Sequence, residues 1–297
     1  MNIRHLEYFV VVAGELHFRR SAERLGITQA PLSLAIQALE SDLGATLFHR
    51  TRRTVALTEA GHALLEEARI ILARVEHARE SVWETASGEV GRLRVGFTNA
   101  TSLSPIFPRL IHAYRTQRPR VRIALSELSS LQQIDALEQR ELDVGLLRLP
   151  QNALPSDLVS NPLMEEPLLL AVQSSHRLAR AKSVRIADLR NEPFIAYPKQ
   201  AGVAISEQIF ALCAKRGFVP EVVQEAQQAS TLIGLIATGL GVGLVPATLQ
   251  TIAVPGVVFR KLDDPDTTTT LHIAHRYGDV NARVVQFVEL ARSLAAH

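Results

Sequence analysis

Apolar residues near the start of the chain recur at helical spacing and predict two short helices. The positions that carry this pattern are Leu6, Phe9, Val10 and Ala13 in the first helix and Phe18, Ala22 and Leu25 in the second. Gly26 can adopt the left-handed conformation that closes a helix. Thr28 can cap a third helix, whose first turn tolerates Pro31. Together these signals predict a tight helix-turn-helix.

The third helix is predicted to have one buried face and one outward face. Its apolar stripe consists of Leu32, Ile36, Leu39 and Leu43. The outward face carries Gln29, Ala30, Pro31, Ser33, Leu34 and Gln37. Small and amide side chains of this kind can contact base edges in a DNA major groove. An ordinary amphipathic helix on the protein surface is the alternative interpretation of the same pattern.

A basic turn follows the third helix. Arg50, Arg52 and Arg53 lie close together, and the alternation at Val55 and Leu57 predicts a short strand after them. We interpret this segment as a wing whose arginines reach DNA phosphates or a minor groove. A solvated surface turn is the alternative, but the preceding helix-turn-helix favours the wing.

A long helix is predicted from residue 59 to about residue 87. Its apolar seam, spaced alternately by four and three residues, is Leu64, Ala68, Ile71, Val75, Ala78 and Val82. This heptad spacing favours a stalk through which two copies pair, and packing against the chain's own domains is the competing interpretation. Ser87 and the glycines Gly88 and Gly91 then break the helix and predict a hinge.

Beyond the hinge, short apolar runs typical of strands alternate with helical segments. This order predicts a mostly parallel sheet in an α/β fold, with ligands bound outside the carboxyl ends of the strands. The order is repeated after residue 163, so two similar lobes are expected. The expected domains are an all-α winged helix-turn-helix at 1–58, a linker helix and hinge at 59–91, and a two-lobed α/β domain at 92–297. Lobe 1 is expected at 92–162 and 267–297, and lobe 2 at 163–266.

Composition excludes several classes of protein. Of 297 residues, 47% are hydrophobic and 21% charged, which excludes wholesale disorder, and the net charge of +2 confines any basic surface to a local patch. The single cysteine, Cys213, excludes an internal disulfide and fits a reducing cytoplasm. No export signal is expected, because Glu7 interrupts the N-terminal apolar stretch. Glycines and prolines divide the uncharged run at 232–259, so no membrane span is expected there.

The order of motifs resembles the LysR-type family of bacterial transcriptional regulators over essentially the whole chain. The N-terminal motifs are the run from His17 to Leu25, the run from Thr28 to Ser33, Leu47-Phe48 and the run from Leu57 to Gly61. The later motifs are Leu142-Asp143-Val144-Gly145, the run from Glu166 to Ala171 and the run from Gly239 to Pro246. One departure is that Leu34 and Ala35 stand where many members carry arginine and glutamine, which brings the usual base contacts into question.

The resemblance implies a DNA-binding regulator that acts as a homodimer or tetramer on an interrupted palindrome. Its effector-binding domain would be similar to periplasmic binding proteins, and a small molecule in the cleft would alter transcription. RNA polymerase is a further candidate partner. The run from Gly96 to Thr98, together with the run from Gly145 to Pro150, looks most like the branch that senses aromatic carboxylates or muconate-like diacids. An amino acid or another small metabolite is the alternative effector.

Candidate effector contacts lie on loops at predicted strand ends. Hydroxyls and backbone amides after the first strand of the domain can hold a carboxylate, and the residues there are Thr98, Asn99, Thr101 and Ser102. The resemblance adds residues from the family's cleft, namely Ser129, Arg148, Tyr197, Ser230 and Thr231. For Arg148, the alternative role is to anchor a surface loop.

The sequence gives little support for catalysis. It has no glycine-flanked nucleophile serine and no dinucleotide or phosphate loop, so we expect no enzyme activity, no cofactor and no metal. Cys213 lies in an apolar helical stretch and is expected to be a packed side chain. The alternative to a regulator is a cytoplasmic solute-binding protein or an enzyme with an incidental helical extension.

Overall fold

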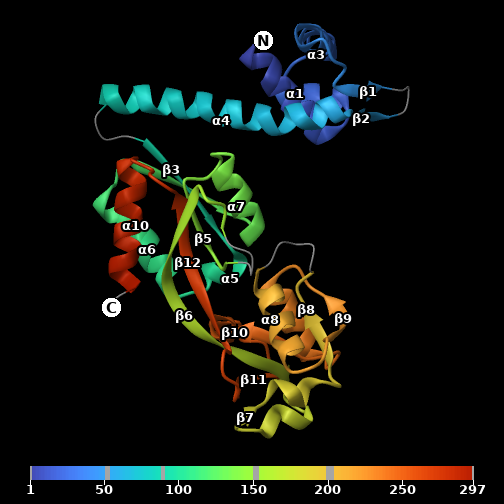
Figure 1. Ribbon diagram of the computed structural model, residues 1–297, viewed down its shortest axis with the longest axis vertical. Helices are drawn as coiled ribbons and strands as arrows, with labels where there is room; N and C mark the ends of the chain where they lie inside the picture. Colours follow the sequence, from blue (N-terminus) through green and yellow to red (C-terminus); the bar gives the residue numbers. More distant parts are fainter. Residues whose placement is uncertain (1, 51–53, 88–90, 150–153, 199–203, 296–297) are drawn as a thin grey trace. The chain divides into compact units, whose positions relative to one another are not determined.

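The computed structural model describes residues 2–50, 54–87, 91–149, 154–198 and 204–295 (Figure 1). It divides into two compact units. Unit 1 consists of Met1–Gly88 and Gln139–Glu141, and unit 2 consists of Glu89–Glu138 and Leu142–His297. Within the described residues, no helix combines the length and the apolar character needed to cross a membrane.

Unit 1 is a three-helix core with a two-stranded wing. Its elements are α1 (Ile3–Glu15), α2 (Phe18–Leu25), α3 (Gln29–Leu43), β1 (Phe48–Arg50), β2 (Val55–Leu57) and α4 (Glu59–Ser87). The strands pair antiparallel. The core is formed by the apolar faces of the first three helices, closed by Phe48 from the first strand. The predicted winged helix-turn-helix is therefore confirmed.

The turn between α2 and α3 depends on a glycine. Gly26 has a φ of 67°, in the left-handed region, and the N–H of Ile27 donates to the carbonyl of Ala22 at 3.0 Å. Glycine adopts this conformation without a steric penalty, so the chain can reverse in a single residue. Thr28 occupies the position before α3, as expected, although its side chain makes no capping hydrogen bond.

The apolar seam of α4 was predicted either to pair two copies or to pack against the chain's own domains. Leu64 and Ile71 pack against the unit 1 core, and Ala68 is completely buried in it. The competing interpretation, packing against the chain's own domain, is therefore correct for the first half of the seam. In the second half Val82 is 70% exposed, so an apolar side chain of the seam is open there to a second copy.

Lobe 1 of unit 2 is built on a mixed sheet with the strand order β4-β3-β5-β12-β6. The strands are β3 (Gly91–Phe97), β4 (Val121–Glu127), β5 (Val144–Leu147), β12 (Thr268–Arg276) and the first part of β6 (Leu158–Gln173). The first three are parallel, but β12 runs antiparallel to both β5 and β6. The expectation of a mostly parallel sheet is therefore wrong beyond β5. The returning chain inserts a strand of opposite direction into the sheet.

Helices cover both faces of the lobe 1 sheet. They are α5 (Asn99–Ser102), α6 (Ile106–Gln117), α7 (Ser130–Glu138) and α10 (Ala282–Ala295). The helices α6 and α10 pack together on one face, and α7 lies on the other (Figure 1). Tyr114 and Phe287 meet edge to face between α6 and α10, with ring centroids 5.0 Å apart.

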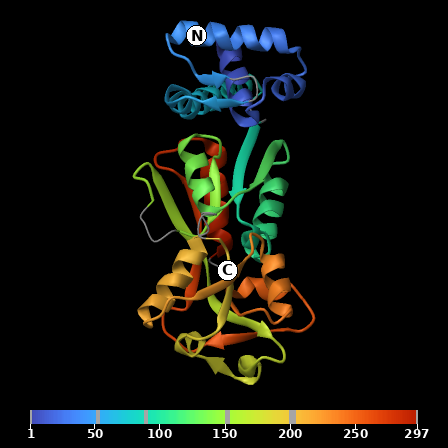
Figure 2. The ribbon, with the colours of Figure 1, turned by 90° about the vertical axis from the view of Figure 1, so that its right-hand side faces the viewer.

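Lobe 2 is reached along β6, which continues from one lobe into the other (Figures 1 and 2). Up to Pro167 this strand pairs with β12, and from Leu168 it pairs with β10 and β11. The remaining elements are η1 (Arg177–Arg180), β7 (Ser183–Val184), η2 (Ile186–Leu189), β8 (Pro193–Ala196), α8 (Ala204–Lys215), β9 (Glu221–Glu225), α9 (Ala229–Ala237), β10 (Gly243–Pro246), η4 (Ala247–Thr251) and β11 (Val257–Leu262). The change of pairing partner lies a few residues beyond the lobe boundary expected after residue 162.

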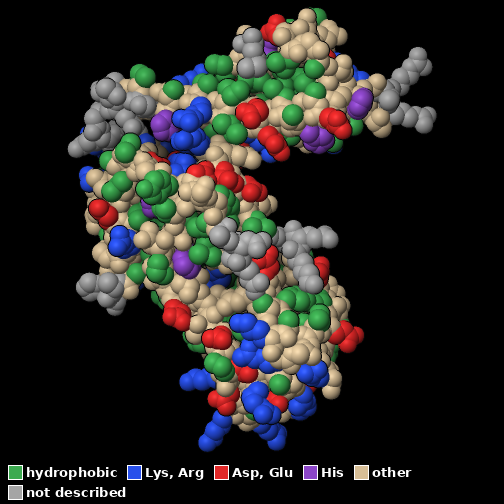
Figure 3. Space-filling view, viewed as in Figure 1, with side chains coloured by type: hydrophobic (Ala, Val, Ile, Leu, Met, Phe, Trp, Pro, Cys, Tyr) green, Lys and Arg blue, Asp and Glu red, His purple; other side chains and the backbone are tan. Residues whose placement is uncertain are grey.

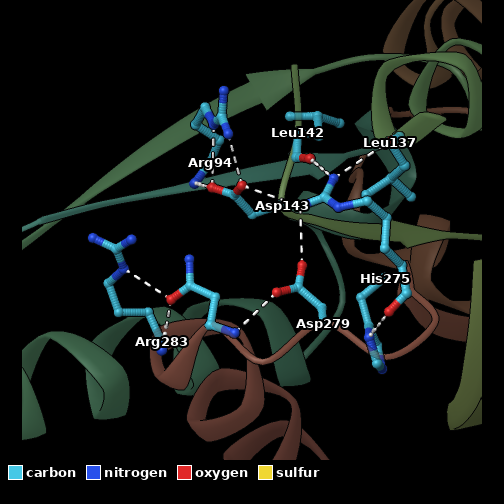
Figure 4. A network of polar contacts seen from close by, with 9 residues as sticks. Arg94, Leu137, Leu142, Asp143, His275, Asp279 and Arg283 are labelled. Carbon is cyan, nitrogen blue, oxygen red and sulfur yellow. Dashed lines mark hydrogen bonds and ion pairs between the residues drawn. The ribbon is translucent and has the colours of Figure 1, made fainter. Parts of the chain in front are cut away.

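The motif Leu142-Asp143-Val144-Gly145 has a visible structural role (Figure 4). The Asp143 carboxylate accepts hydrogen bonds from the backbone and guanidinium of Arg94 and lies 3.4 Å from Nη2 of Arg276. Arg276 also donates to the carbonyls of Leu137 and Leu142. These contacts join β3, β5, α7 and β12 at one edge of lobe 1.

Two glycines allow a polar side chain to lie across the lobe 1 strands. Gln133 is completely buried on α7. A Cβ added at Gly145 would lie 3.0 Å from Oε1 of Gln133 and 3.1 Å from Cδ2 of Leu147. A Cβ at Gly96 would lie 2.5 Å from Cδ1 of Leu142. The absence of a side chain at Gly96 and Gly145 thus leaves room for Gln133 and Leu142 to pack against the strands.

We expect Gly145→Ala to lower the free energy of unfolding of unit 2 by about 1–3 kcal/mol, because the added methyl overpacks the space under Gln133. Denaturant titration of the full chain would measure this. Gly234→Ala in α9 is the matched control, since nothing lies within 4 Å of its added Cβ, and it should be neutral or slightly stabilising. Equal behaviour of the two variants would contradict the packing argument.

Candidate functional site

The outward face of α3 is open to solvent. Gln29, Ala30, Pro31, Leu34 and Gln37 are all exposed, and Ser33 is half-buried. Leu34 keeps 66% of its surface accessible, whereas the neighbouring Ala35 is buried. An exposed leucine flanked by amides can contact a thymine methyl while the amides hydrogen-bond to base edges. The face therefore offers apolar and neutral polar contacts but no charge.

Arg50, predicted as a phosphate contact, is bound within unit 1. Its Nη2 lies 2.7 Å from Oε2 of Glu40, and its guanidinium lies over the ring of Phe18, 4.8 Å from the centroid. Oε1 of Glu40 also accepts the backbone N–H of Leu47. Arg50 thus fastens the first wing strand to α3 and α2. The other two predicted wing arginines, Arg52 and Arg53, lie outside the described residues.

Unit 2 contains a cavity of about 420 Å³ between its two lobes. Residues from strand ends and helix starts line it: Thr98, Asn99, Ala100, Glu127, Leu128, Ser129, Ser130, Gln132, Arg148, Tyr197, Ile205, Gln227, Gln228 and Pro246. Five of the predicted effector contacts are among them, namely Thr98, Asn99, Ser129, Arg148 and Tyr197. Hydroxyl and amide groups predominate among the polar groups of the wall.

Four predicted contacts are not in the cavity wall. Thr101 is 1% exposed, and its hydroxyl lies 2.7 Å from that of Thr98. Ser102 donates its hydroxyl to the carbonyl of Asn99. Ser230 and Thr231 are exposed on the first turn of α9. All four belong to the predicted loop segments, but none of them is part of the cavity wall.

Arg148 is held by an internal ion pair. Its Nη2 lies 2.5 Å from Oε1 of Glu166, and its Nη1 donates to the hydroxyl of Thr269 at 3.3 Å. Both charged side chains are 7% exposed. Burial lowers the pKa of the Arg148 guanidinium, and the Glu166 carboxylate opposes that shift. The positive charge of Arg148 is therefore largely compensated before any ligand binds.

Glu166 connects this ion pair to lobe 2. Its other oxygen, Oε2, accepts both the backbone N–H and the hydroxyl of Thr248, each at 2.6 Å. Because Arg148 follows β5 and Thr248 belongs to η4, the network crosses from one lobe to the other beneath the cavity. Nearby, burial raises the pKa of the Tyr197 phenol well above its usual value, so this group remains a neutral donor.

Asn99 makes a second connection between the lobes. Its Nδ2 donates to Oε1 of Glu127 at 3.2 Å, and its Oδ1 accepts the backbone N–H of Ala229 at 3.3 Å. Glu127 ends β4, and Ala229 begins α9. One side-chain amide therefore joins a carboxylate of lobe 1 to the start of a helix in lobe 2.

Sequence reasoning missed part of the cavity wall. Glu127 is the last residue of β4, and its carboxylate was not among the predicted contacts. Gln227 and Gln228 precede α9, one turn before the residues that were chosen. The signal that could have found them is the general rule that ligands gather at strand ends and before helices.

Cys213 is completely buried, and burial raises the pKa of its thiol to about 12. Across the residues that the structure covers, no group of three or more His, Cys, Asp or Glu side chains could hold a metal ion.

Comparisons with known proteins cover both units. Residues 3–62 match the family model of the bacterial regulatory helix-turn-helix protein, lysR family, and residues 86–296 match the LysR substrate binding domain. The chain is 35% identical over 291 residues to the HTH-type transcriptional regulator AlsR of Bacillus subtilis, covering 98% of this chain and 95% of that protein.

Solved structures show the same similarity. Full-length CbnR complexed with its target DNA has a TM-score of 0.78 and 27% identity, covering 99% of this chain and 100% of that one. The BenM effector binding domain with its effector benzoate has a TM-score of 0.63 and 29% identity, covering 69% of this chain and 92% of that one.

We expect Glu166→Gln to lower the free energy of unfolding by about 3 kcal/mol, because it leaves the buried Arg148 charge without a counter-ion. The exposed neighbour Glu165 provides the matched control, and Glu165→Gln should change stability by less than about 0.5 kcal/mol. Thermal and denaturant unfolding would measure both. Similar losses for the two variants would argue against a stabilising role for the network.

We expect the Cys213 thiol to resist iodoacetamide in the folded protein at pH 8, because the thiolate is the reactive form and a pKa of about 12 keeps it scarce. Mass spectrometry of the treated protein would detect alkylation. The thiol should react once denaturant unfolds lobe 2. Rapid alkylation of the folded chain would show that this segment opens readily.

Proposed function

The chain belongs to the LysR family of DNA-binding transcriptional regulators, and from this we propose that α3 reads its operator while a small molecule in the unit 2 cavity controls transcription. The observation that carries the DNA part is the exposed, uncharged face of α3 in a unit built as a winged helix-turn-helix. The observation that carries the ligand part is the polar cavity between the lobes.

The DNA contacts that we propose are Gln29, Ala30, Pro31, Ser33, Leu34 and Gln37, with Arg52 and Arg53 as phosphate contacts. Arg50 has a positioning role, since it is bound to Glu40. The structure of CbnR with its target DNA supports DNA binding by the family. We assign the protein to the cytoplasm, where bacterial DNA lies.

The assembly that we propose is a homodimer or tetramer on an interrupted palindrome. The exposed second half of the α4 seam, with Val82, supports pairing of two copies. We retain the domain division at residues 58 and 91, and RNA polymerase as a further partner. We propose binding without catalysis for the cavity, because the similar proteins are named as regulators.

The effector site that we propose is the cavity wall, with Thr98, Asn99, Ser129, Arg148 and Tyr197 in it. BenM, with benzoate in its effector domain, supports ligand binding in this part of the family. Aromatic carboxylates and muconate-like diacids remain one class of candidate effector, and amino acids remain another.

We expect Leu34→Ala and Gln37→Ala each to weaken binding to DNA upstream of the protein's own gene by about 1–2 kcal/mol, roughly 5- to 30-fold. Fluorescence anisotropy at fixed ionic strength would measure the affinity. Affinity for unrelated DNA should hardly change, because base contacts carry sequence information and phosphate contacts do not. The exposed Gln250 of η4 gives the control variant Gln250→Ala. The absence of salt-dependent binding by the unaltered protein would refute the proposal.

A further inference from the structure

The side chain of Asn99, a residue of the cavity wall, makes two hydrogen bonds at once. Its N–H2 donates to the Glu127 carboxylate, at 3.2 Å, and its carbonyl accepts the Ala229 N–H, at 3.3 Å. Asn99 and Glu127 line the cavity, and Ala229 directly follows the lining residue Gln228. The two groups therefore require a donor and an acceptor that lie next to each other on the bound molecule.

The charges around the cavity favour a partner with a positive group. Glu127 is exposed to the cavity and forms no ion pair with any residue that the structure describes. Arg148, the described cation of the wall, is already paired with Glu166. A second carboxylate on a ligand would be repelled by Glu127 or would compete with Glu166 for Arg148. A protonated amine would instead complement Glu127.

We propose that the effector is an α-amino acid whose ammonium group binds Glu127 and whose carboxylate accepts the Ala229 N–H. The ligand replaces the Asn99 amide, which carries the same adjacent donor and acceptor. Asn99 is thus an internal competitor for the site, and Glu127 is the residue that selects for the amine. This inference rests on the proposed function, in which the cavity is the effector site.

The apolar part of the wall accommodates the side chain of such a ligand. Ala100, Leu128, Ile205 and Pro246 line the same cavity of about 420 Å³. Glu127 and Ala229 would then bind the ammonium and carboxylate groups that all α-amino acids share, while the four apolar wall residues contact the ligand's side chain.

The first test is a thermal-shift screen of the full chain, followed by calorimetric titration of each hit. The probes are the proteinogenic α-amino acids, benzoate and cis,cis-muconate at millimolar concentration. Each amino acid that raises the melting temperature is compared with the same molecule lacking the amine. We expect an amino acid to bind and its deaminated counterpart to bind about fivefold more weakly or worse. Binding by the acids alone, or by no amino acid, would overturn the inference.

Two variants test the residues named. Glu127→Gln should weaken binding of the amino acid about fivefold, because the ion pair is lost, while Asn99→Ala should strengthen it several-fold, because the competitor is removed. The control is Glu225→Gln, an exposed carboxylate at the end of β9 outside the cavity wall. Equal affinity of Glu127→Gln and the control would overturn the assignment of Glu127. Weaker binding by Asn99→Ala would show that Asn99 is a ligand contact and not a competitor.

A further variant separates this inference from the function on which it rests. Ile205 is 5% exposed and lines the cavity, so Ile205→Trp should fill part of it and abolish binding of any hit. If muconate binds, the amino acids do not, and Ile205→Trp abolishes muconate binding, the cavity remains the effector site and the amino-acid assignment is wrong. If a hit binds Ile205→Trp unchanged, the cavity itself is the wrong site, and both proposals fail.

Discussion

The buried ion pair between Arg148 and Glu166 is the contact on which the architecture of unit 2 depends. Glu166 lies on β6 immediately before this strand changes partners, and it binds Arg148 of lobe 1 and Thr248 of lobe 2 through different oxygens. Two desolvated charges are stable in such a place only when their remaining hydrogen bonds are satisfied. The pair therefore connects the two lobes, and its Arg148 forms part of the cavity wall.

The same ion pair influences which ligands the cavity can bind. An unpaired arginine in the wall would favour the binding of anions. With its charge compensated, the other polar side chains of the wall carry hydroxyls, amides and the Glu127 carboxylate. Such a wall recognises the pattern of donors and acceptors on a small molecule more than its total charge. Asn99 is positioned to respond to that pattern because it touches both lobes.

Much of the fold could be predicted because local patterns determine it. The stripe on α3, the Gly26 turn and the strands of lobe 1 follow from periodicity and from the conformational freedom of glycine. The direction of β12 could not be predicted, since it depends on where a distant segment re-enters the sheet. Nor could the partners of Arg50 and Arg148, because Glu40 and Glu166 are brought to them by tertiary structure. The sequence indicated candidate loops for the site, but which of their side chains face the cavity depends on single helical turns that a sequence pattern does not resolve.

The burial of Ala68 in the unit 1 core bears on the distance between the two DNA half-sites that a dimer can bind. Since α4 is packed into the same core as α3, we expect α3 and the first half of α4 to move together within each subunit. In a dimer paired through the far end of α4, the angle at which the two α4 helices cross would then set the distance between the two α3 helices, and with it the separation of the DNA half-sites. A change of a few degrees at that crossing would shift each recognition helix along the groove without altering a single contact inside unit 1.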